Sequence, residues 1–322
     1  MGAKSATEKD REELSIKDAI ELFLKSCRAS GLSTSTLIQY DFSLGKFAEL
    51  IGAEKAVATL SVEDADKFLA NLTTTCRGKP LSNKSRRNYF RCVSAWDSWL
   101  CDRHYLKERF TKGVKLPKAQ QKAITPISPE EFASILNVIP NRGVGRRDRV
   151  LYSLLFDTGG RVSEILAVER RDVDVERRVI LLRDTKNGDE RPISFGPTCQ
   201  NLLRDYLTRM EGDSRYQRQP RLFCSTNGSP MSRHDAYRRL KEAGREAGIN
   251  HGVRCSPHTL RHSAAIASLR AGTNPLTVMQ QLGHKDISML KKYTMIAEVD
   301  LIAASEKADL LGKVIGRKQV SW

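Results

Sequence analysis

The chain has 322 residues, a length that favours two domains over one. It carries 54 Lys and Arg against 38 Asp and Glu, a formal net charge of +16, so we expect an acidic polymer, most simply nucleic acid, as its partner. Seven scattered cysteines without a C-x-x-C pair exclude a disulfide scaffold, and no apolar run has the length of a signal peptide core or a membrane span. These features predict a cytoplasmic, nucleoid-associated protein.

Residues 14–110 show the periodicity of helices throughout. Apolar residues recur at helical spacing from Ile16, with a stop signal at Gly31. Further helices are expected over residues 35–51, 61–72 and 82–105. The last of them carries an apolar stripe and a separate basic stripe, which consists of Lys84, Arg87, Asn88 and Arg91. We expect a four-helix domain whose basic stripe contacts DNA; the alternative is an ordinary solvated helix face.

Residues 111–127 lose this apolar periodicity. Four lysines and two prolines in this segment are typical of an extended basic linker. Such a linker would lie along a DNA backbone between two basic domains, although a simple solvated connection has the same composition.

Residues 128–322 form the expected second domain. A helix is expected to begin at Ser128-Pro129-Glu130. Serine is a favourable N-cap, proline suits the first helical position and an acidic residue suits the first turn. Further segments are expected as helices over 145–156 and 161–168, as strands over 173–175, 179–182 and 191–195, and as mostly helix from 198 to about 311. An Asn187-Gly188 turn predicts a hairpin between the last two strands. The fold class is therefore mainly α with a small antiparallel sheet.

A basic and aromatic set lies along this second domain. Arg161 follows two glycines and shares a helix face with Glu164, which by itself is typical of a surface ion pair. His258 and Arg261 lie in the first turns of a helix capped by Ser256, where unpaired N–H groups favour a phosphate. A helix beginning at Ser232 carries Arg238, Lys241 and Arg245 on one face and is a second candidate for DNA contact.

Three further residues complete the set: Lys186 beside the hairpin turn, His284 after a glycine, and Tyr293 nine residues later. Each alone is more typical of a surface or packing residue. A zinc site drawn from His251, Cys255, His258 and His262 is the weaker interpretation, because His262 precedes apolar residues and is expected to be buried. We expect no metal and no cofactor.

In this order and spacing, the set resembles the tyrosine recombinase (phage integrase) family, particularly its two-domain Xer- and Cre-like members. Family members carry Arg-x-x-Glu after a Thr-Gly turn, a hairpin lysine, His-x-x-Arg, Gly-His, and a tyrosine about nine residues beyond. Gly160 and Met295 depart from the family pattern, where a larger apolar residue and a histidine are more usual. Neither departure removes a catalytic group, so they leave the subfamily open.

The resemblance implies a helical (SAM-like) core-binding domain over 14–110 and a catalytic domain over 128–322 with a subunit-exchange helix at 298–311. The alternative for this last helix is packing within its own subunit. It further implies site-specific recombination through a 3′-phosphotyrosyl intermediate, on double-stranded DNA, by a tetramer that can need accessory proteins. The alternatives are a type IB topoisomerase-like enzyme and a non-catalytic DNA-binding protein. Only about 14 residues precede the first helix, from which we expect no arm-binding domain.

Overall fold

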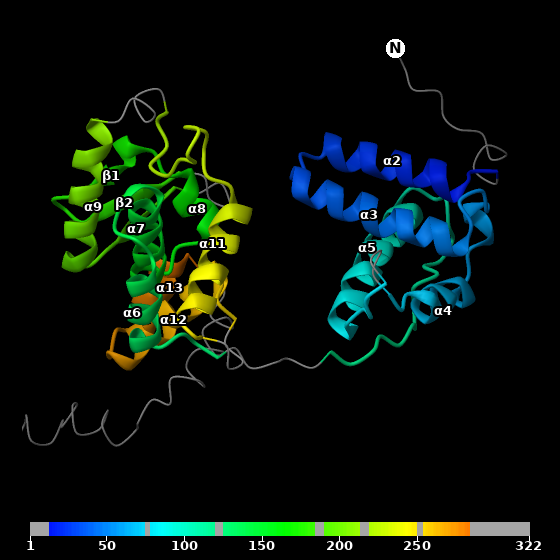
Figure 1. Cartoon of the computed structure of the whole chain (residues 1–322). Helices are drawn as coiled ribbons and strands as arrows, with labels where there is room; N and C mark the ends of the chain where they lie inside the picture. The colour runs from blue at the N-terminus through cyan, green and yellow to red at the C-terminus, as the bar shows by residue number, and fades with distance from the viewer. Residues whose placement is uncertain are drawn as a thin grey trace, which may run out of the picture. The chain divides into compact units, whose positions relative to one another are not determined.

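The computed structural model describes residues 13–74, 78–119, 125–183, 190–212, 219–249 and 254–283. The chain forms two compact units, Met1–Lys122 and Ala123–Trp322, each with its own hydrophobic core (Figure 1). No helix in these described ranges combines the length and the apolar character that crossing a membrane would require.

The described part of the N-terminal unit confirms the expected four helices. They are α2 (Ile16–Ala29), α3 (Thr34–Ile51), α4 (Val62–Asn71) and α5 (Asn83–Asp102), with a short 3₁₀ turn, η1, at Val57–Thr59. A serine precedes each α-helix as its N-cap, and the side chains of Ser15, Ser33 and Ser82 accept a hydrogen bond from a backbone N–H of the first turn. These local bonds explain why the helix starts could be read from sequence.

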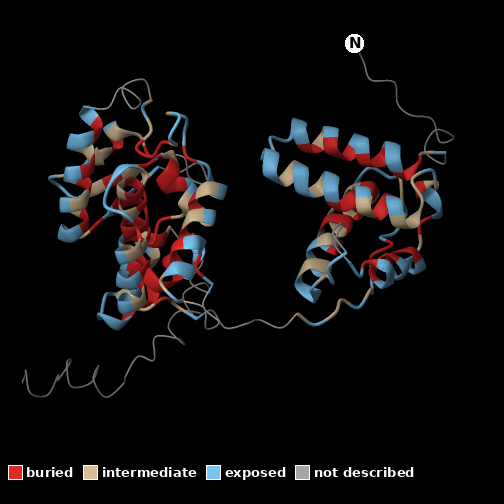
Figure 2. Cartoon of the chain, in the orientation of Figure 1, coloured by how far each residue is buried: buried red, intermediate tan, exposed pale blue. Residues whose placement is uncertain are grey.

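Aromatic rings fill the core of this unit. Phe47 of α3 packs edge-on against Phe68 of α4, with ring centroids 5.1 Å apart, and against Trp96 of α5 at 5.7 Å. All three side chains are fully buried, as the red interior of the unit in Figure 2 illustrates. Edge-to-face pairs add a specific preference to the burial of large apolar area.

The segment expected as a linker begins inside this unit. The fully buried Asp97 carboxylate accepts hydrogen bonds from the backbone N–H groups of Phe110 and Thr111 at 3.2 and 3.0 Å. Farther along, Asn83 at the start of α5 donates to the carbonyl of Lys118 at 3.0 Å. Residues 111–118 therefore follow the surface of the helical unit before the chain reaches the second one.

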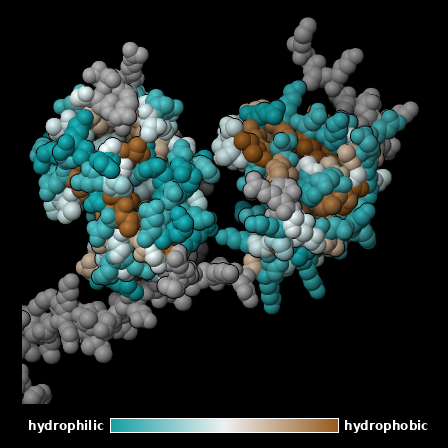
Figure 3. Space-filling model, viewed as in Figure 1, coloured by the Kyte–Doolittle hydropathy of each residue, from teal (hydrophilic) through white to brown (hydrophobic). Residues whose placement is uncertain are grey.

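Most of the described surface is polar, but the helical unit also exposes large apolar side chains. Ile38 and Phe42, one turn apart on α3, are 64% and 58% exposed. A hydrophobic area over α2 and α3 is visible in Figure 3.

The C-terminal unit combines helices with one small sheet, as expected. The helices are α6 (Pro129–Val138), α7 (Gly143–Thr158), α8 (Val162–Ala167), α9 (Pro197–Glu211), α11 (Arg233–Glu246), α12 (Pro257–Arg270) and α13 (Pro275–Leu282), with the 3₁₀ turn η2 at Arg170–Asp172. The strands are β1 (Val173–Asp174), β2 (Val179–Leu182) and β3 (Arg191–Ser194). They form an antiparallel sheet in the order β1-β2-β3, with Leu182 opposite Arg191 at the last described pair.

Helix α7 lies at the centre of this unit. It packs against α12 and α9, and its residues Val150, Leu151, Leu154 and Leu155 are all buried. Tyr152 is buried with them, and its hydroxyl donates to the carbonyl of Ala236 on α11 at 3.0 Å. This packing fixes the C-terminal end of α7, from which the candidate site begins.

Candidate active site

A glycine turn places Arg161. Helix α7 ends at Thr158, and its C-cap Gly159 has φ 63°, in the left-handed region that favours glycine. A Cβ atom there would lie 2.5 Å from the Cδ2 of Leu282, so glycine also permits the close approach of α13. Arg161 then stands two residues later as the first residue before α8, with its side chain 29% exposed.

Glu164 lies beside Arg161 and is almost completely buried. Its Oε1 accepts a hydrogen bond from the Arg161 Nη1 at 2.7 Å, and its Oε2 accepts from the Arg161 backbone N–H at 3.1 Å. The expected helix-face pair is therefore present, but with 1% of the carboxylate side chain exposed it is not a surface pair.

Arg191 is a functional candidate that the sequence reasoning missed. From β3, its Nη2 donates to the other oxygen of Glu164, Oε2, at 2.8 Å, and its Nη1 donates to the carbonyl of Gln281 at 2.8 Å. Burial lowers the pKa of Arg191, while the charge of Glu164 acts in the opposite direction. The sequence held a signal: Arg191 lies two residues before the apolar Ile193 in an expected strand, and side chains two apart in a strand share a face, which favours an inward-pointing Arg191 with a partner.

Arg261 of α12 lies deeper, with 4% of the residue exposed. Its Nη1 donates to the carbonyl of Gly159 at 2.7 Å, and its Nη2 donates to the carbonyl of Leu282 at 2.8 Å. The guanidinium therefore joins the end of α7 to the end of α13. Its five N–H donors in a planar fork allow such multiple contacts.

His258 lies one turn before His262 on α12, and the Nε2 atoms of the two rings are 2.9 Å apart. His258 is exposed, whereas His262 is buried with 8% exposure, as expected from its apolar surroundings. Ser256 caps this helix by accepting from the backbone N–H of Thr259 at 3.1 Å.

The arginines converge on the C-terminal end of α13. The carbonyls of Gln281, Leu282 and Gly283 accept hydrogen bonds from Arg191, Arg261 and Arg161 respectively, the last at 3.4 Å. Cations are favourable at a helix C-terminus because the last carbonyls carry partial negative charge. This end of α13 immediately precedes His284.

Lys186, His284 and Tyr293 lie outside the described residues, as does the expected helix 298–311. The structure therefore brings Arg161, Glu164, Arg191 and Arg261 together at the C-terminal end of α13. His258 lies three residues before Arg261 on α12 and pairs with His262.

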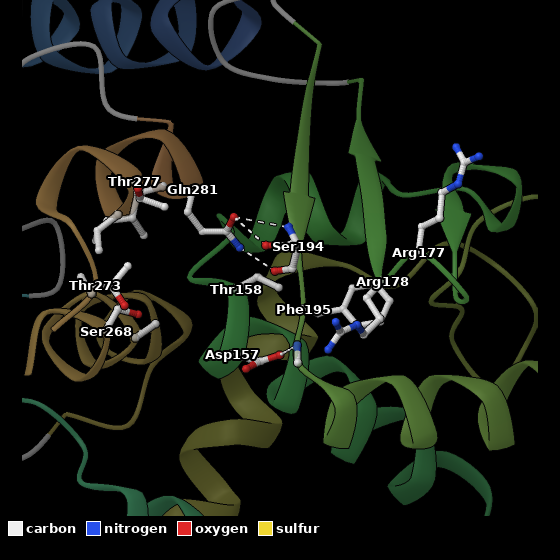
Figure 4. Close-up of a pocket in the computed structure, with 15 residues that line it drawn as sticks. Asp157, Thr158, Arg177, Arg178, Ser194, Phe195, Ser268, Thr273, Thr277 and Gln281 are labelled. Atoms are coloured by element: carbon white, nitrogen blue, oxygen red, sulfur yellow. Dashed lines mark hydrogen bonds between the residues drawn. The ribbon is translucent and has the colours of Figure 1, made fainter. Parts of the chain in front are cut away.

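A pocket of about 390 Å³ lies on the neighbouring side of α13 (Figure 4). Gln281 lines this pocket and pairs with β3: its Nε2 donates to the carbonyl of Ser194 at 2.6 Å, and its Oε1 accepts from the backbone N–H of Ser194 at 3.3 Å. Asp157 accepts from the backbone N–H of Gly196 at 2.6 Å. The bonds of Gln281, with those of Arg191, attach α13 to β3. The bond of Asp157 joins the end of α7 to the segment after β3.

The two sets of expected DNA contacts differ in their surroundings. Lys84, Arg87, Asn88 and Arg91 on α5 are all exposed. Arg238, Lys241 and Arg245 on α11 are exposed too, but Arg238 lies 3.9 Å from a carboxylate oxygen of Asp235 and 3.7 Å from one of Glu242. The α5 stripe therefore keeps more of its positive charge for an external partner.

Of the residues weighed for zinc, His251 lies outside the described ranges. Cys255 is buried against Gly244 of α11, and burial raises the pKa of its thiol. No cluster of three or more His, Cys, Asp or Glu suited to a metal ion occurs among the described residues. Cys255 packs against α11 as part of the core of the C-terminal unit.

Comparison with known proteins identifies the family of this chain. Residues 126–299 match the phage integrase family. The tyrosine recombinase XerA of Pyrococcus furiosus is 31% identical over 311 residues, covering 95% of this chain and 99% of the relative. The tyrosine recombinase XerD of Staphylococcus haemolyticus is 27% identical over 88% of this chain and 95% of its own.

Solved structures share the fold. The integrase of transposon Tn1549 in complex with transposon right end DNA aligns with a TM-score of 0.72 at 19% identity, over 92% of this chain and 100% of that one. The XerH site-specific recombinase bound to its difH substrate aligns with a TM-score of 0.68 at 22% identity, over 91% and 84%. With the family match over more than half of its length, the chain belongs to the phage integrase family of tyrosine recombinases.

Proposed function

We propose that this tyrosine recombinase cuts and rejoins DNA at specific sites with Tyr293 as its nucleophile. The phenolic oxygen of Tyr293 attacks the scissile phosphorus and the bond to the 5′-oxygen breaks, which gives a 3′-phosphotyrosyl link and a free 5′-hydroxyl. A 5′-hydroxyl from a partner strand reverses the step. Because the phosphotyrosyl bond retains the free energy of the phosphodiester, this reaction needs no high-energy nucleotide.

One observation carries the proposal: Arg161 and Arg261, 100 positions apart, both donate to the last carbonyls of α13, directly before His284. Guanidinium groups at this point would hold the non-bridging phosphate oxygens and stabilise their charge in the transition state. His284 would add a hydrogen bond to the same phosphate. Glu164 would orient Arg161, to which it is bonded at 2.7 Å.

Proton transfer is assigned to the remaining groups. A tyrosine with its ordinary pKa of about 10 is mostly protonated near neutral pH, so it needs a proton acceptor. His258 is exposed at the start of α12 and would take this proton. Lys186 would donate a proton to the leaving 5′-oxygen.

Double-stranded DNA is the substrate of this proposal. The helical region 14–110 would act as a core-binding domain, the catalytic domain would span 128–322, and the basic segment 111–127 would connect them on one site. Exposed Lys84, Arg87, Asn88 and Arg91 would contact groove and phosphates, with Arg238, Lys241 and Arg245 as a second set. The enzyme would act in the cytoplasm, in association with the nucleoid.

Recombination exchanges strands between two sites, each bound by two subunits, so we propose a tetramer on DNA. Segment 298–311, with Val299, Ile302, Leu310 and Leu311, has the pattern of an amphipathic helix that would dock on a neighbouring subunit. Accessory DNA-bending proteins or a partner recombinase would add direction to the exchange. Removal of residues 298–322 should then abolish tetramers on DNA but leave binding to a single site intact, as measured by sedimentation with and without duplex.

The chemistry is tested by trapping. A duplex selected from a random-sequence library for binding to the protein is prepared as a set of nicked versions, with the nick moved by one nucleotide at a time. We expect the parent protein to give a covalent protein–DNA band on a denaturing gel and Tyr293→Phe to give none while still shifting the duplex.

Bound DNA without any covalent band would contradict the proposal and favour a non-catalytic DNA-binding protein. A covalent band together with relaxation of supercoiled plasmid, but without strand exchange between two sites, would favour a topoisomerase-like enzyme.

A further inference from the structure

Arg191 contacts two parts of the site, Glu164 and the C-terminal end of α13. Its position in the sequence identifies neither of these partners. Its side chain is 17% exposed, and its Nη2 lies 2.8 Å from Oε2 of Glu164. The same guanidinium donates to the carbonyls of Gln281 at 2.8 Å and Leu282 at 3.4 Å. Gly283 follows with φ 66°, and a Cβ atom on it would lie 2.5 Å from the Nε of Arg191, so a larger residue there would displace this side chain.

The buried carboxylate of Glu164 needs a second cationic partner besides Arg161. Its carboxylate is 1% exposed and bonds to Arg161 through both oxygens. A buried carboxylate without a paired charge is strongly unfavourable. If Arg161 were its only cationic partner, any shift of that guanidinium toward a DNA phosphate would leave Glu164 unpaired, and this penalty would oppose the contact that catalysis needs.

We propose that Arg191 is a positioning residue that holds the charge of Glu164 and so leaves Arg161 able to engage the scissile phosphate. Arg191 does not itself touch the substrate in this assignment; it acts through Glu164 on Arg161. The inference rests on the proposed function, because it presumes that Arg161 binds the phosphate undergoing cleavage.

A purely structural role is the competing explanation. Arg191 also bonds to the end of α13, so its loss could simply loosen that helix. The two explanations differ in what removal of the Glu164 charge should do. If Arg191 compensates the charge of Glu164, loss of Arg191 should not slow adduct formation further once Glu164 has been neutralised. If Arg191 only anchors α13, its loss should slow the reaction whether or not Glu164 is charged.

The experiment compares Arg191→Gln, Glu164→Gln and the double variant in the full chain. The probe is the nicked duplex on which the parent protein forms its covalent band, at saturating protein, and the rate of adduct formation is measured. We expect Arg191→Gln to be about 10- to 100-fold slower than the parent, the scale of a small misplacement of a catalytic group. We expect the double variant to recover to within about fivefold of Glu164→Gln alone, because sites in direct contact are not additive.

Two matched variants keep the result interpretable. Arg191→Lys retains a cation beside Glu164 without the planar fork, so it should keep most of the rate; a lysine variant as slow as the glutamine variant would overturn the proposal. Arg204→Gln removes another arginine of this unit, paired with Glu176 at 2.9 Å on the surface, and should leave the rate unchanged. Thermal unfolding and duplex shift of every variant establish that it is folded and binds.

The proposal is overturned if Arg191→Gln reacts at the parent rate, or if the double variant is slower than Glu164→Gln alone by the same factor by which Arg191→Gln is slower than the parent. Either result, obtained while the parent forms its adduct, rejects the role of Arg191 and leaves the proposed function standing. Absence of an adduct with the parent protein rejects the tyrosine chemistry itself, and the role of Arg191 with it.

Discussion

The imidazole of His258 shares a hydrogen bond with that of His262, Nε2 to Nε2 at 2.9 Å, and the ring planes are inclined at 72°. One ring must donate and the other accept, so both cannot be imidazolium ions in this arrangement, because an imidazolium has no acceptor. His262, buried on the next turn of α12, therefore orients the exposed His258 and restricts its protonation state.

This pairing predicts that His262→Leu slows formation of the covalent adduct by about tenfold, because a proton acceptor that is poorly oriented loses part of its contribution. The measurement is the rate on a nicked duplex at saturating protein. His234→Leu, which changes an exposed histidine of α11, serves as the control. A rate for His262→Leu equal to that of the control would mean that the pair has no part in the reaction.

Replacement by alanine should destabilise the protein far more at Gly159 than at Gly248, although both glycines have a positive φ. Alanine at Gly159 would meet Leu282 at 2.5 Å, whereas Gly248, with φ 75°, has no atom within 4 Å of the added Cβ. We expect Gly248→Ala to cost about 1 kcal/mol of unfolding free energy from the left-handed backbone alone, and Gly159→Ala about 2–4 kcal/mol because overpacking adds to it. Chemical denaturation followed by circular dichroism measures the unfolding free energy of both variants. Equal losses would show that α13 shifts away from the added Cβ atom without a cost in free energy.

The two phenylalanines of α3 should also differ in how much their replacement by alanine lowers the unfolding free energy. Phe47 is fully buried, whereas Phe42 is 58% exposed against Tyr89. Phe47→Ala should lower the unfolding free energy of the helical unit by about 3–5 kcal/mol, and Phe42→Ala by about 1 kcal/mol or less. Tryptophan fluorescence follows this transition because Trp96 lies 5.7 Å from Phe47. Comparable losses for the two variants would be inconsistent with the packing described for this core.

The α5 stripe is expected to contact phosphates. The double variant Lys84→Gln, Arg91→Gln should weaken duplex binding at every sequence and reduce the slope of log affinity against log salt by about 2, since each phosphate contact contributes about 0.9. Filter binding over a salt series gives the slope. Lys67→Gln on α4 removes an exposed lysine outside the stripe and should leave the slope unchanged. An unaltered slope in the double variant would move the DNA contacts to another face.

Much of the fold could be predicted because its signals are local. The serine caps at Ser15, Ser33 and Ser82 bond within their own first turns, and apolar periodicity reports which face of a helix is buried. The antiparallel pairing of β2 with β3 was likewise predictable from a turn signal between two short apolar runs. The hydrogen bonds of residues 110–118 to Asp97 and Asn83, by contrast, involve partners that no sequence pattern identifies.

The sequence by itself determined the basic charge, the helical character and the order of Arg161, Glu164, His258 and Arg261, because residue type and short-range spacing express these directly. Only the tertiary structure decided that Arg191 joins Glu164, that His262 pairs with His258, and that three arginines meet at the end of α13. The bonds from Arg161 to Gly283 and from Arg261 to Gly159 span more than 100 positions each. Contacts at such separation arise from the packing of α7, α12 and α13 together, and the spacing of residues along the chain does not encode them.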